Sequence, residues 1–311
     1  AVMQKGKIVE VGQAQAIFDN PQHPYTQKLI AALPSMQSCE TRAIKPDATS
    51  FLEVRHFSCF YPIRKGVFKR VVDYVRAVDD VSFTLQRGKT LALVGESGCG
   101  KTTLGKALLH LIPFNGGEVF LDGIAFHNLS SESLRQERAA MQIIFQDPFS
   151  SMNPRLLVGD IIAEGLSALR PEMTANEREM RVRKLLQRVE LPEEAMYRYP
   201  HEFSGGQRQR ICIARALAVE PKVIICDEPT SALDVSVQSQ IIKLLKTLQE
   251  EQGMSYLFIT HDLAVVSEIA DEVAVMYRGK IVEQGAVAQI LTQPQHTYTQ
   301  KLLSAIPCAV A

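Results

Sequence analysis

An apolar segment that runs into a glycine-rich loop limits the folds open to this chain more than any other feature. Residues 91–94 read LALV, residues 95–102 read GESGCGKT, and a helical pattern follows. This order matches the G-x-x-x-x-G-K-[ST] pattern, in which glycines let the backbone wrap closely around phosphate oxygens. The N-terminus of the following helix adds a favourable potential for an anion. The sequence therefore predicts a phosphate-binding loop between a strand and a helix.

The residue types in this loop predict a nucleoside triphosphate as the ligand. Lys101 is expected to contact the β- and γ-phosphates, and the Thr102 hydroxyl is expected to bind Mg²⁺. Cys99 is interpreted as a small residue that fits the turn, with a redox-sensitive thiol as the alternative. The residues expected around the phosphates are Gly95, Glu96, Ser97, Gly98, Cys99, Gly100, Lys101, Thr102 and Thr103.

A second apolar segment ends in two carboxylates. Residues 222–228 read KVIICDE, so Asp227 lies 125 positions after Thr102. A buried strand that ends in acidic residues can deliver both to the phosphate pocket. Asp227 is expected to hold Mg²⁺ through water, and Glu228 is expected to polarise the attacking water as a general base.

Composition indicates an ordinary globular protein. Apolar residues make up 46% of the chain, charged residues make up 22%, and the formal net charge is zero. Balanced charge argues against a broad electrostatic footprint for DNA or RNA, so no nucleic-acid partner is predicted. No apolar run approaches the roughly 20 residues of a membrane-spanning helix. The six cysteines form no C-x-x-C pair, which predicts reduced thiols and no metal cluster.

The two ends of the chain repeat each other. Residues 1–34 align without gaps with residues 274–307, and about 20 of the 34 aligned positions are identical. The second copy follows the nucleotide-binding motifs, whereas the first copy precedes them. We therefore expect residues 1–34 to be the C-terminal tail of a preceding ATP-binding module in a longer polypeptide. The alternative is a free-standing protein whose own tail was duplicated.

Four regions are predicted along the chain. Between residues 51 and 269, short apolar segments alternate with helical patterns, which is typical of an α/β domain around a largely parallel sheet. These segments are VSFTL (81–85), TLALVG (90–95), MQIIF (141–145), KVIIC (222–226) and YLFIT (256–260). The regions are the first tail (1–34), a polar linker (35–50), the nucleotide-binding domain (51–273) and the second tail (274–311).

A helical subdomain is predicted inside the nucleotide-binding domain, at about residues 154–204. Thr174 and Glu177 form a capping-box pattern at the start of one of its helices. The apolar residues that follow have the i, i+3, i+4, i+7 spacing of one helix face. They are Val182, Leu185, Leu186 and Val189.

A further motif distinguishes this chain from other nucleotidases with a phosphate loop. Phe203-Ser204-Gly205-Gly206-Gln207 precedes the helical run RQRICIARALA, so a hydroxyl and glycine N–H groups lie at another helix N-terminus. That arrangement is a second anion site, and one phosphate does not need two such sites in one domain. Here the sequence resembles the ABC ATPase family, whose LSGGQ signature it matches except for Phe203 in the first position.

The resemblance implies an α/β fold of the P-loop nucleoside triphosphatase class. Its expected parts are a RecA-like parallel-sheet core, an antiparallel β subdomain and the inserted helical subdomain. The implied cofactors are ATP and Mg²⁺, and the implied reaction is ATP hydrolysis. In this family the signature of one module, here Ser204, Gly205, Gly206 and Gln207, closes over ATP held by the phosphate loop of another. Hydrolysis therefore needs a second module, upstream in the same polypeptide or in a second copy.

The resemblance also implies roles for single residues. Gln146, in FQDP, is expected to sense Mg²⁺ and to contact the membrane partner, and His261, in ITHD, is expected to contact the γ-phosphate. Residues 231–234, which end at Asp234, are expected to cross the dimer interface beside the nucleotide. Tyr61 is predicted to stack on adenine. Phe57 and Phe60 are the alternatives for that platform.

The two tails narrow the resemblance to one subfamily. PQHPYT (21–26) and PQHTYT (294–299) look like the His-Pro-Tyr tail of peptide and nickel importer ATPases, with Thr297 in place of the proline. The resemblance implies import of peptides or peptide-like compounds, transmembrane permease subunits as partners, and an extracytoplasmic substrate-binding protein as an indirect partner. It places the chain at the cytoplasmic face of the bacterial inner membrane. The alternatives are a soluble two-module protein that acts on ribosomes or nucleic acid, and a regulatory module that binds ATP without hydrolysing it.

Overall fold

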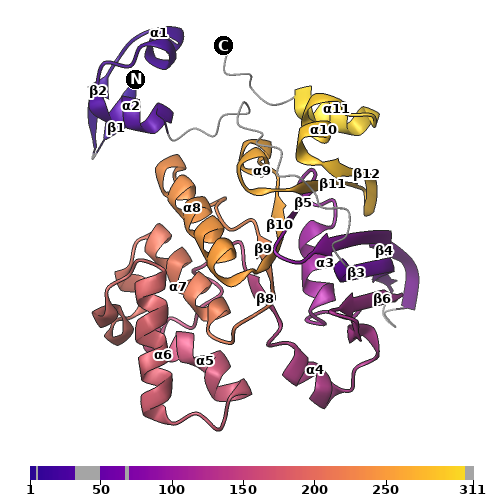
Figure 1. Ribbon diagram of the computed structural model, residues 1–311. Coiled ribbons are helices and arrows are strands. Elements are labelled where there is room, and N and C mark those ends of the chain that lie inside the picture. The colour runs from indigo at the N-terminus through magenta and orange to yellow at the C-terminus, as the bar shows by residue number, and fades with distance from the viewer. Residues whose placement is uncertain (5, 32–49, 67–69, 305–311) are drawn as a thin grey trace.

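The computed structural model describes residues 1–4, 6–31, 50–66 and 70–304 (Figure 1). The predicted linker over 35–50 lies outside the described residues, except for Ser50, which begins a strand. No helix in these ranges is long and apolar enough to span a bilayer.

The strands are β1 (Val2–Gln4), β2 (Lys7–Glu10), β3 (Ser50–Lys65), β4 (Arg70–Gln86), β5 (Thr90–Val94), β6 (Gly116–Leu121), β7 (Ile124–Ala125), β8 (Met141–Ile144), β9 (Val223–Asp227), β10 (Ser255–Thr260), β11 (Glu272–Tyr277) and β12 (Lys280–Ala286). The helices are α1 (Ala14–Asp19), α2 (Pro24–Ala31), α3 (Lys101–Leu108), α4 (Ser131–Glu137), α5 (Val158–Leu169), α6 (Ala175–Arg188), α7 (Gly205–Leu217), α8 (Val235–Gln252), α9 (Leu263–Ile269), α10 (Val287–Thr292) and α11 (Thr297–Ser304). Short 3₁₀ turns are η1 (Phe126–Asn128), η2 (Glu193–Tyr197) and η3 (Pro200–Glu202).

A six-stranded, mainly parallel sheet forms the centre of the molecule, as the fold class predicts. Its strand order is β12-β11-β5-β10-β9-β8. All neighbouring pairs are parallel except β11 and β12, which form an antiparallel hairpin at one edge. Four of the five predicted apolar segments lie in this sheet. Three inner strands, β5, β9 and β10, are buried along their whole length, which explains their nearly unbroken apolar sequences.

The fifth segment, VSFTL, lies outside the central sheet, in a second, antiparallel sheet with strand order β4-β3-β6-β7, which is the antiparallel subdomain that the resemblance implies. Val81, Phe83 and Leu85 are buried, whereas Ser82 and Thr84 are exposed. This alternation is typical of an antiparallel strand with one face on the core. The period of two in the sequence is therefore the signal that could have assigned the segment to the antiparallel sheet.

The central sheet is covered on both faces by separate apolar clusters. Along β9, Ile224 packs in the cluster that contains the helical subdomain. Its neighbour Ile225 packs in the cluster that joins the central sheet to the antiparallel sheet. Successive residues of a strand point to opposite faces, so one strand supports both layers.

The predicted helical subdomain is present as α5, α6, η2 and η3, and it packs against α7. At the start of α6, the Thr174 hydroxyl accepts the Glu177 amide N–H, and the Glu177 carboxylate accepts the Thr174 amide N–H. The predicted capping box is confirmed. The predicted apolar face is also confirmed, because all four of its residues are buried.

The duplicated tails adopt the same local structure. α1 and α2 correspond in length and position to α10 and α11, and β2 corresponds to the start of β12. The second copy is integrated into the central sheet, and the boundary predicted after residue 273 falls inside β11. The first copy lies apart from the sheets, beyond one end of α8 (Figure 1).

Candidate functional site

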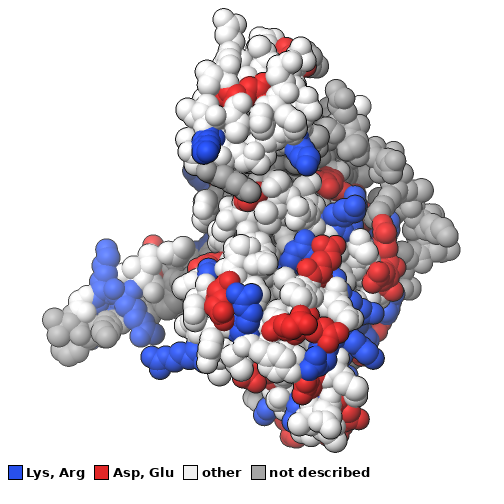
Figure 2. Space-filling view, turned by 90° about the vertical axis from the view of Figure 1, so that its left-hand side faces the viewer, with Lys and Arg blue, Asp and Glu red and all other residues white. Residues whose placement is uncertain are grey.

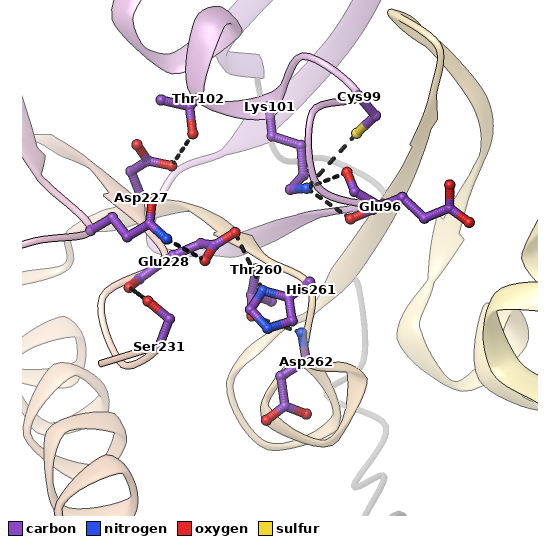
Figure 3. A network of polar contacts seen from close by, with 12 residues as sticks. Glu96, Cys99, Lys101, Thr102, Asp227, Glu228, Ser231, Thr260, His261 and Asp262 are labelled. Atoms are coloured by element: carbon purple, nitrogen blue, oxygen red, sulfur yellow. Dashed lines mark hydrogen bonds and ion pairs between the residues drawn. The ribbon is translucent and has the colours of Figure 1, made fainter. Parts of the chain in front are cut away.

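The carboxyl ends of three neighbouring strands bring most of the predicted site residues together (Figure 3). The phosphate loop follows β5, the two carboxylates lie at the end of β9, and His261 follows β10. Because β5, β10 and β9 are adjacent and parallel, their carboxyl ends meet at one edge of the sheet. Ligands of open α/β sheets bind at that edge.

Glycines give the phosphate loop its shape at positions where other residues do not fit. Gly100 has φ +115°, and a Cβ there would overlap the Ala77 carbonyl oxygen of β4. Gly95 has φ +155°, and a Cβ there would overlap the Met276 carbonyl oxygen of β11. The loop is thus enclosed by backbone from both sheets, so its amides can be aimed at a ligand only if these positions lack side chains.

Lys101 lies inside the loop and is only 4% exposed. Its ammonium donates to the Gly95 carbonyl at 2.7 Å and to the Glu96 carbonyl at 3.0 Å, and it lies 3.8 Å from the Cys99 sulfur. No carboxylate of the described residues pairs with it. A buried cation whose contacts are all neutral is well suited to an anionic ligand, because burying an unpaired charge is costly.

Thr102 and Asp227 form the second part of the site. The Thr102 hydroxyl donates to an Asp227 carboxylate oxygen at 2.8 Å. Burial raises the pKa of Asp227 above its ordinary value, and the bond from Thr102 opposes that shift. A hydroxyl and a carboxylate side by side fit Mg²⁺, which binds oxygen and takes its remaining ligands from water and phosphate.

Glu228 is held in a network with two other predicted residues. Its carboxylate accepts a hydrogen bond from the Gln146 side-chain amide at 2.9 Å, and its other oxygen lies 3.3 Å from His261 Nδ1. Glu228 also has φ +46°, the left-handed conformation, and its amide donates to the Ile259 carbonyl at 2.9 Å. Strained backbone of this kind gathers at functional sites, where the surrounding structure fixes it.

The signature residues are not part of this cluster. Ser204 caps α7, where its hydroxyl accepts the Gln207 amide N–H while the Gln207 side chain accepts the Ser204 amide N–H. Among the described residues, no hydrogen bond or ion pair joins them to the phosphate loop. Gly206 packs against Val237 of α8, and Ser204 and Gln207 are exposed. The signature therefore presents an exposed helix N-terminus of its own.

Asp234 has a local structural contact that the sequence interpretation did not include. Its carboxylate caps α8 by accepting the Val237 amide N–H at 3.0 Å and the Ser236 hydroxyl at 2.7 Å. The Ser236 bond is the main reason that the pKa of Asp234 is lowered. Upstream in the same loop, the Ser231 hydroxyl donates to the Glu228 carbonyl at 3.1 Å.

The candidate adenine platforms differ in exposure. Phe57 is fully buried and packs on Phe114, with ring centroids 4.9 Å apart, so it belongs to the core. Phe60 is half-buried under the Arg76 guanidinium. Tyr61 is 42% exposed and pairs with Val75, two residues from Ala77, whose carbonyl borders the phosphate loop. The exposure of their side chains and their register in the β3–β4 hairpin keep Tyr61 and Phe60 as candidates for the adenine platform.

Sequence reasoning assigned no role to Gly279, whose amide donates to the Cys99 carbonyl at 2.9 Å. Gly279 lies in the turn between β11 and β12 and has φ +84°. The sequence signal that could have identified Gly279 is the Gly-Lys pair that both tail copies contain at the same position, Gly6-Lys7 and Gly279-Lys280.

Family models match most of this architecture. The model described as ABC transporter matches residues 78–231, which run from the middle of β4 to the loop after Glu228. The model described as Oligopeptide/dipeptide transporter, C-terminal region, matches two stretches, 9–64 and 282–310. The two stretches include parts of both tail copies.

Curated relatives match the chain almost from end to end. A glutathione import ATP-binding protein from Pectobacterium atrosepticum is 47% identical over 99% of this chain and 53% of its own length. A peptidoglycan transport ATP-binding protein from Agrobacterium fabrum is 47% identical over 98% of this chain and 55% of its own length. The chain thus spans about half the length of these relatives.

A solved structure confirms the fold class. An ATP-binding cassette solved as a dimer in a post-hydrolysis state with ADP and Pi is 28% identical, with a TM-score of 0.67 over 76% of this chain and 99% of that one. The match extends beyond the central sheet, because it covers nearly the whole of the solved cassette. Together with the family models and the relatives, it places this chain in the ABC transporter family of ATP-binding proteins, within the oligopeptide/dipeptide group.

Proposed function

We propose that this chain is the ATP-binding and ATP-hydrolysing part of an ABC importer for peptides or peptide-like compounds. One observation carries the proposal: the phosphate loop, Asp227 and Glu228 share one edge of the sheet, while Ser204 to Gln207 present a separate, exposed anion site. Such an ATP site is complete only when the signature of one module contacts the ATP that the phosphate loop of another module holds. ATP binding therefore closes two modules against each other, and hydrolysis reopens them.

Each side chain has a role that follows from its position. The Lys101 ammonium has three donors and uses two on loop carbonyls, so the third can turn from the Cys99 sulfur to a phosphate oxygen. Glu228 accepts a proton from the attacking water, which forms a bond to the γ-phosphorus as the bond to ADP breaks. Gln146 and His261, the two neighbours of its carboxylate, orient that water and contact the γ-phosphate.

Thr102 and Asp227 are the residues that hold Mg²⁺ in this proposal, with Gln146 nearby. The ion supplies charge neutralisation for the phosphate oxygens when it is bound. Tyr61, a residue of the antiparallel sheet, stacks on adenine. Asp234 ends the loop of residues 231–234, and this loop borders the paired module.

We also propose that residues 1–34 are the end of a preceding ATP-binding module in a longer polypeptide. Met3 is 60% exposed, whereas Met276, at the same place in the second copy, lies in β11 of the central sheet and is fully buried beside the phosphate loop. If residues 1–34 belong to a preceding module, the surface that would cover their apolar side chains also lies in that module. Such side chains are then exposed in the first copy and buried in the second. The length of the curated relatives supports the same proposal.

The remaining assignments of the chain follow from these two proposals. Residues 35–50 link the modules, residues 51–273 form the cassette with its helical subdomain at about 154–204, and residues 274–311 form the tail. The cassette binds transmembrane permease subunits at the cytoplasmic face of the bacterial inner membrane, and an extracytoplasmic binding protein acts through them. Figure 2 shows acidic and basic side chains interspersed over the main body of the face that it draws, whereas the projection at the left of the view carries mainly basic side chains.

Sharing of ATP sites between modules predicts that two inactive variants restore activity when mixed. Lys101→Ala removes the phosphate contact, and Ser204→Arg blocks the signature. In a mixed dimer, the intact phosphate loop of one chain meets the intact signature of the other. Random pairing in a two-fold dimer places one complete site in half of the dimers, so phosphate release is expected to recover to about one quarter of the unmodified rate.

Each variant alone serves as the control and is expected to be inactive. A mixture in which the two variants pair, yet which stays as inactive as its components, would contradict the shared site. Activity of Ser204→Arg alone at the unmodified rate would show that each module hydrolyses ATP without a partner.

The transport role predicts which proteins accompany the chain. Affinity purification from detergent-solubilised membranes is expected to recover the tagged chain with two polytopic permease subunits. ATP hydrolysis by that complex should rise when the binding protein and its peptide are added, because the permease couples the two sides. Recovery with ribosomes, and without any membrane subunit, would reject the transport role.

A further inference from the structure

The second tail contains a tyrosine whose hydroxyl reaches the phosphate loop. Tyr298, the second residue of α11, is 7% exposed and packs on Tyr277 of β11 with ring centroids 4.2 Å apart. Its hydroxyl accepts a hydrogen bond from the Glu96 amide N–H, with an N···O distance of 3.0 Å. The two residues are 202 positions apart in the chain. The tail is therefore in direct contact with the loop expected to bind ATP.

The peptide that Tyr298 contacts is the one that Lys101 contacts from the other side. The Glu96 N–H and the Gly95 carbonyl belong to one peptide unit, and the Lys101 ammonium donates to that carbonyl at 2.7 Å. Because a peptide unit is planar, fixing its N–H also fixes the direction of its C=O. The hydrogen bond that the Tyr298 hydroxyl accepts from Glu96 thus helps to determine where the Lys101 ammonium is held.

The tyrosine is itself fixed by a carboxylate on β12. The Glu283 carboxylate accepts the Gln295 amide N–H at 2.7 Å and the His296 amide N–H at 3.1 Å. His296 Nδ1 then accepts the Tyr298 amide N–H at 3.1 Å. These bonds tie the start of α11 to the edge of the central sheet, so the hydroxyl is aimed by rigid elements.

The first tail repeats this support without the contact. The Glu10 carboxylate accepts the Gln22 amide N–H at 2.8 Å and the His23 amide N–H at 3.1 Å, and His23 Nδ1 accepts the Tyr25 amide N–H at 3.1 Å. Among the described residues, the Tyr25 hydroxyl has no hydrogen-bond partner. The chain therefore contains the same tyrosine in the same local structure, once with a phosphate loop behind it and once without.

We infer that Tyr298 is a positioning residue for the ATP site, which holds the Gly95–Glu96 peptide so that Lys101 faces the phosphates. The inference rests on the proposed function of the loop and adds the tail to the site. It also gives the tail a role in the nucleotide site that is independent of the transported compound.

Tyr298→Phe tests the inference because it removes the hydroxyl and keeps the ring that packs on Tyr277. A neutral hydrogen bond contributes modestly, so the KM for ATP is expected to rise about 2- to 10-fold. The kcat is expected to change less than about twofold, because the loop holds substrate and transition state alike. The melting temperature without nucleotide is expected to fall only slightly, since the packing is retained and one neutral hydrogen bond is lost. Tyr25→Phe is the matched control, expected to leave KM, kcat and the melting temperature unchanged.

The outcomes separate the inference from the proposed function. If Tyr298→Phe has the KM of the unmodified chain, the hydroxyl does not position the loop and the inference is wrong. If both variants raise KM equally, the effect belongs to tail folding and the inference is again wrong. If the unmodified chain and Tyr25→Phe bind no ATP in equilibrium titrations, the proposed function itself fails.

Discussion

Replacing Glu228 with glutamine is expected to lower ATP turnover by a factor of about 10² to 10⁴, the range that general bases contribute. Glutamine keeps the length and shape of the side chain and can still accept the hydrogen bond that Gln146 donates at 2.9 Å. It cannot accept a proton from the attacking water. ATP binding is expected to be retained, because the phosphate contacts come from the loop and not from Glu228. Phosphate release and equilibrium ATP binding, measured on the same preparation, separate the two effects.

A glutamate elsewhere in the chain provides the matched control. Glu220 also has a left-handed backbone, with φ +57°, and it precedes β9 at the amino end of the strand, opposite to Glu228. Its side chain is 65% exposed and pairs with Arg181. Glu220→Gln therefore makes the same chemical change on the same kind of backbone and is expected to leave turnover unchanged. If Glu228→Gln retains turnover within about twofold of the control, Glu228 is not the base.

Replacing Gly100 with alanine is expected to weaken ATP binding on the order of 100-fold, through strain of a few kcal/mol. The backbone at Gly100 has φ +115°, which residues with a Cβ rarely adopt. The new methyl group would also overlap the Ala77 carbonyl oxygen and press on the Met276 side chain. The loop must leave its position to relieve both contacts, and its amides then no longer converge on the phosphates. ATP titration with and without Mg²⁺ measures the loss.

Gly116 is the control for the glycine prediction. It lies in β6, its φ is not in the left-handed region, and a Cβ there would meet nothing within 4 Å. Gly116→Ala is expected to bind ATP as the unmodified chain does. Equal affinities of the two variants would mean that the shape of the loop does not depend on Gly100.

The parts of the site that could be predicted from sequence are those whose residues are close in the chain. The phosphate loop and the Asp227–Glu228 pair each follow one strand, so local pattern was enough to predict strand, loop and carboxylates. The capping box at Thr174 was predictable for the same reason. The bond between Thr102 and Asp227, which are 125 positions apart, was expected only through the chemistry that both motifs share.

Other parts depended on which surfaces meet, which local pattern does not encode. Phe57, Phe60 and Tyr61 are neighbours in the sequence. Yet Phe57 packs on Phe114 and belongs to the core, whereas Tyr61 is exposed. The contact of Tyr298 with Glu96 needs the whole central sheet to bring α11 behind the loop. The counterpart of the His-Pro-Tyr motif at residues 296–298 was visible in the sequence, but nothing near it indicated what the tyrosine hydroxyl contacts.

The repeated tail also gives the molecule an internal reference state. One copy is docked against a phosphate loop and the other is not, while the carboxylate and histidine hydrogen bonds that hold the last helix of each copy are the same. The difference in amide exchange between the two copies therefore reports how much docking stabilises the tail against local opening. Linkage is reciprocal: whatever free energy bound nucleotide adds to docking of the tail, the docked tail adds to nucleotide binding.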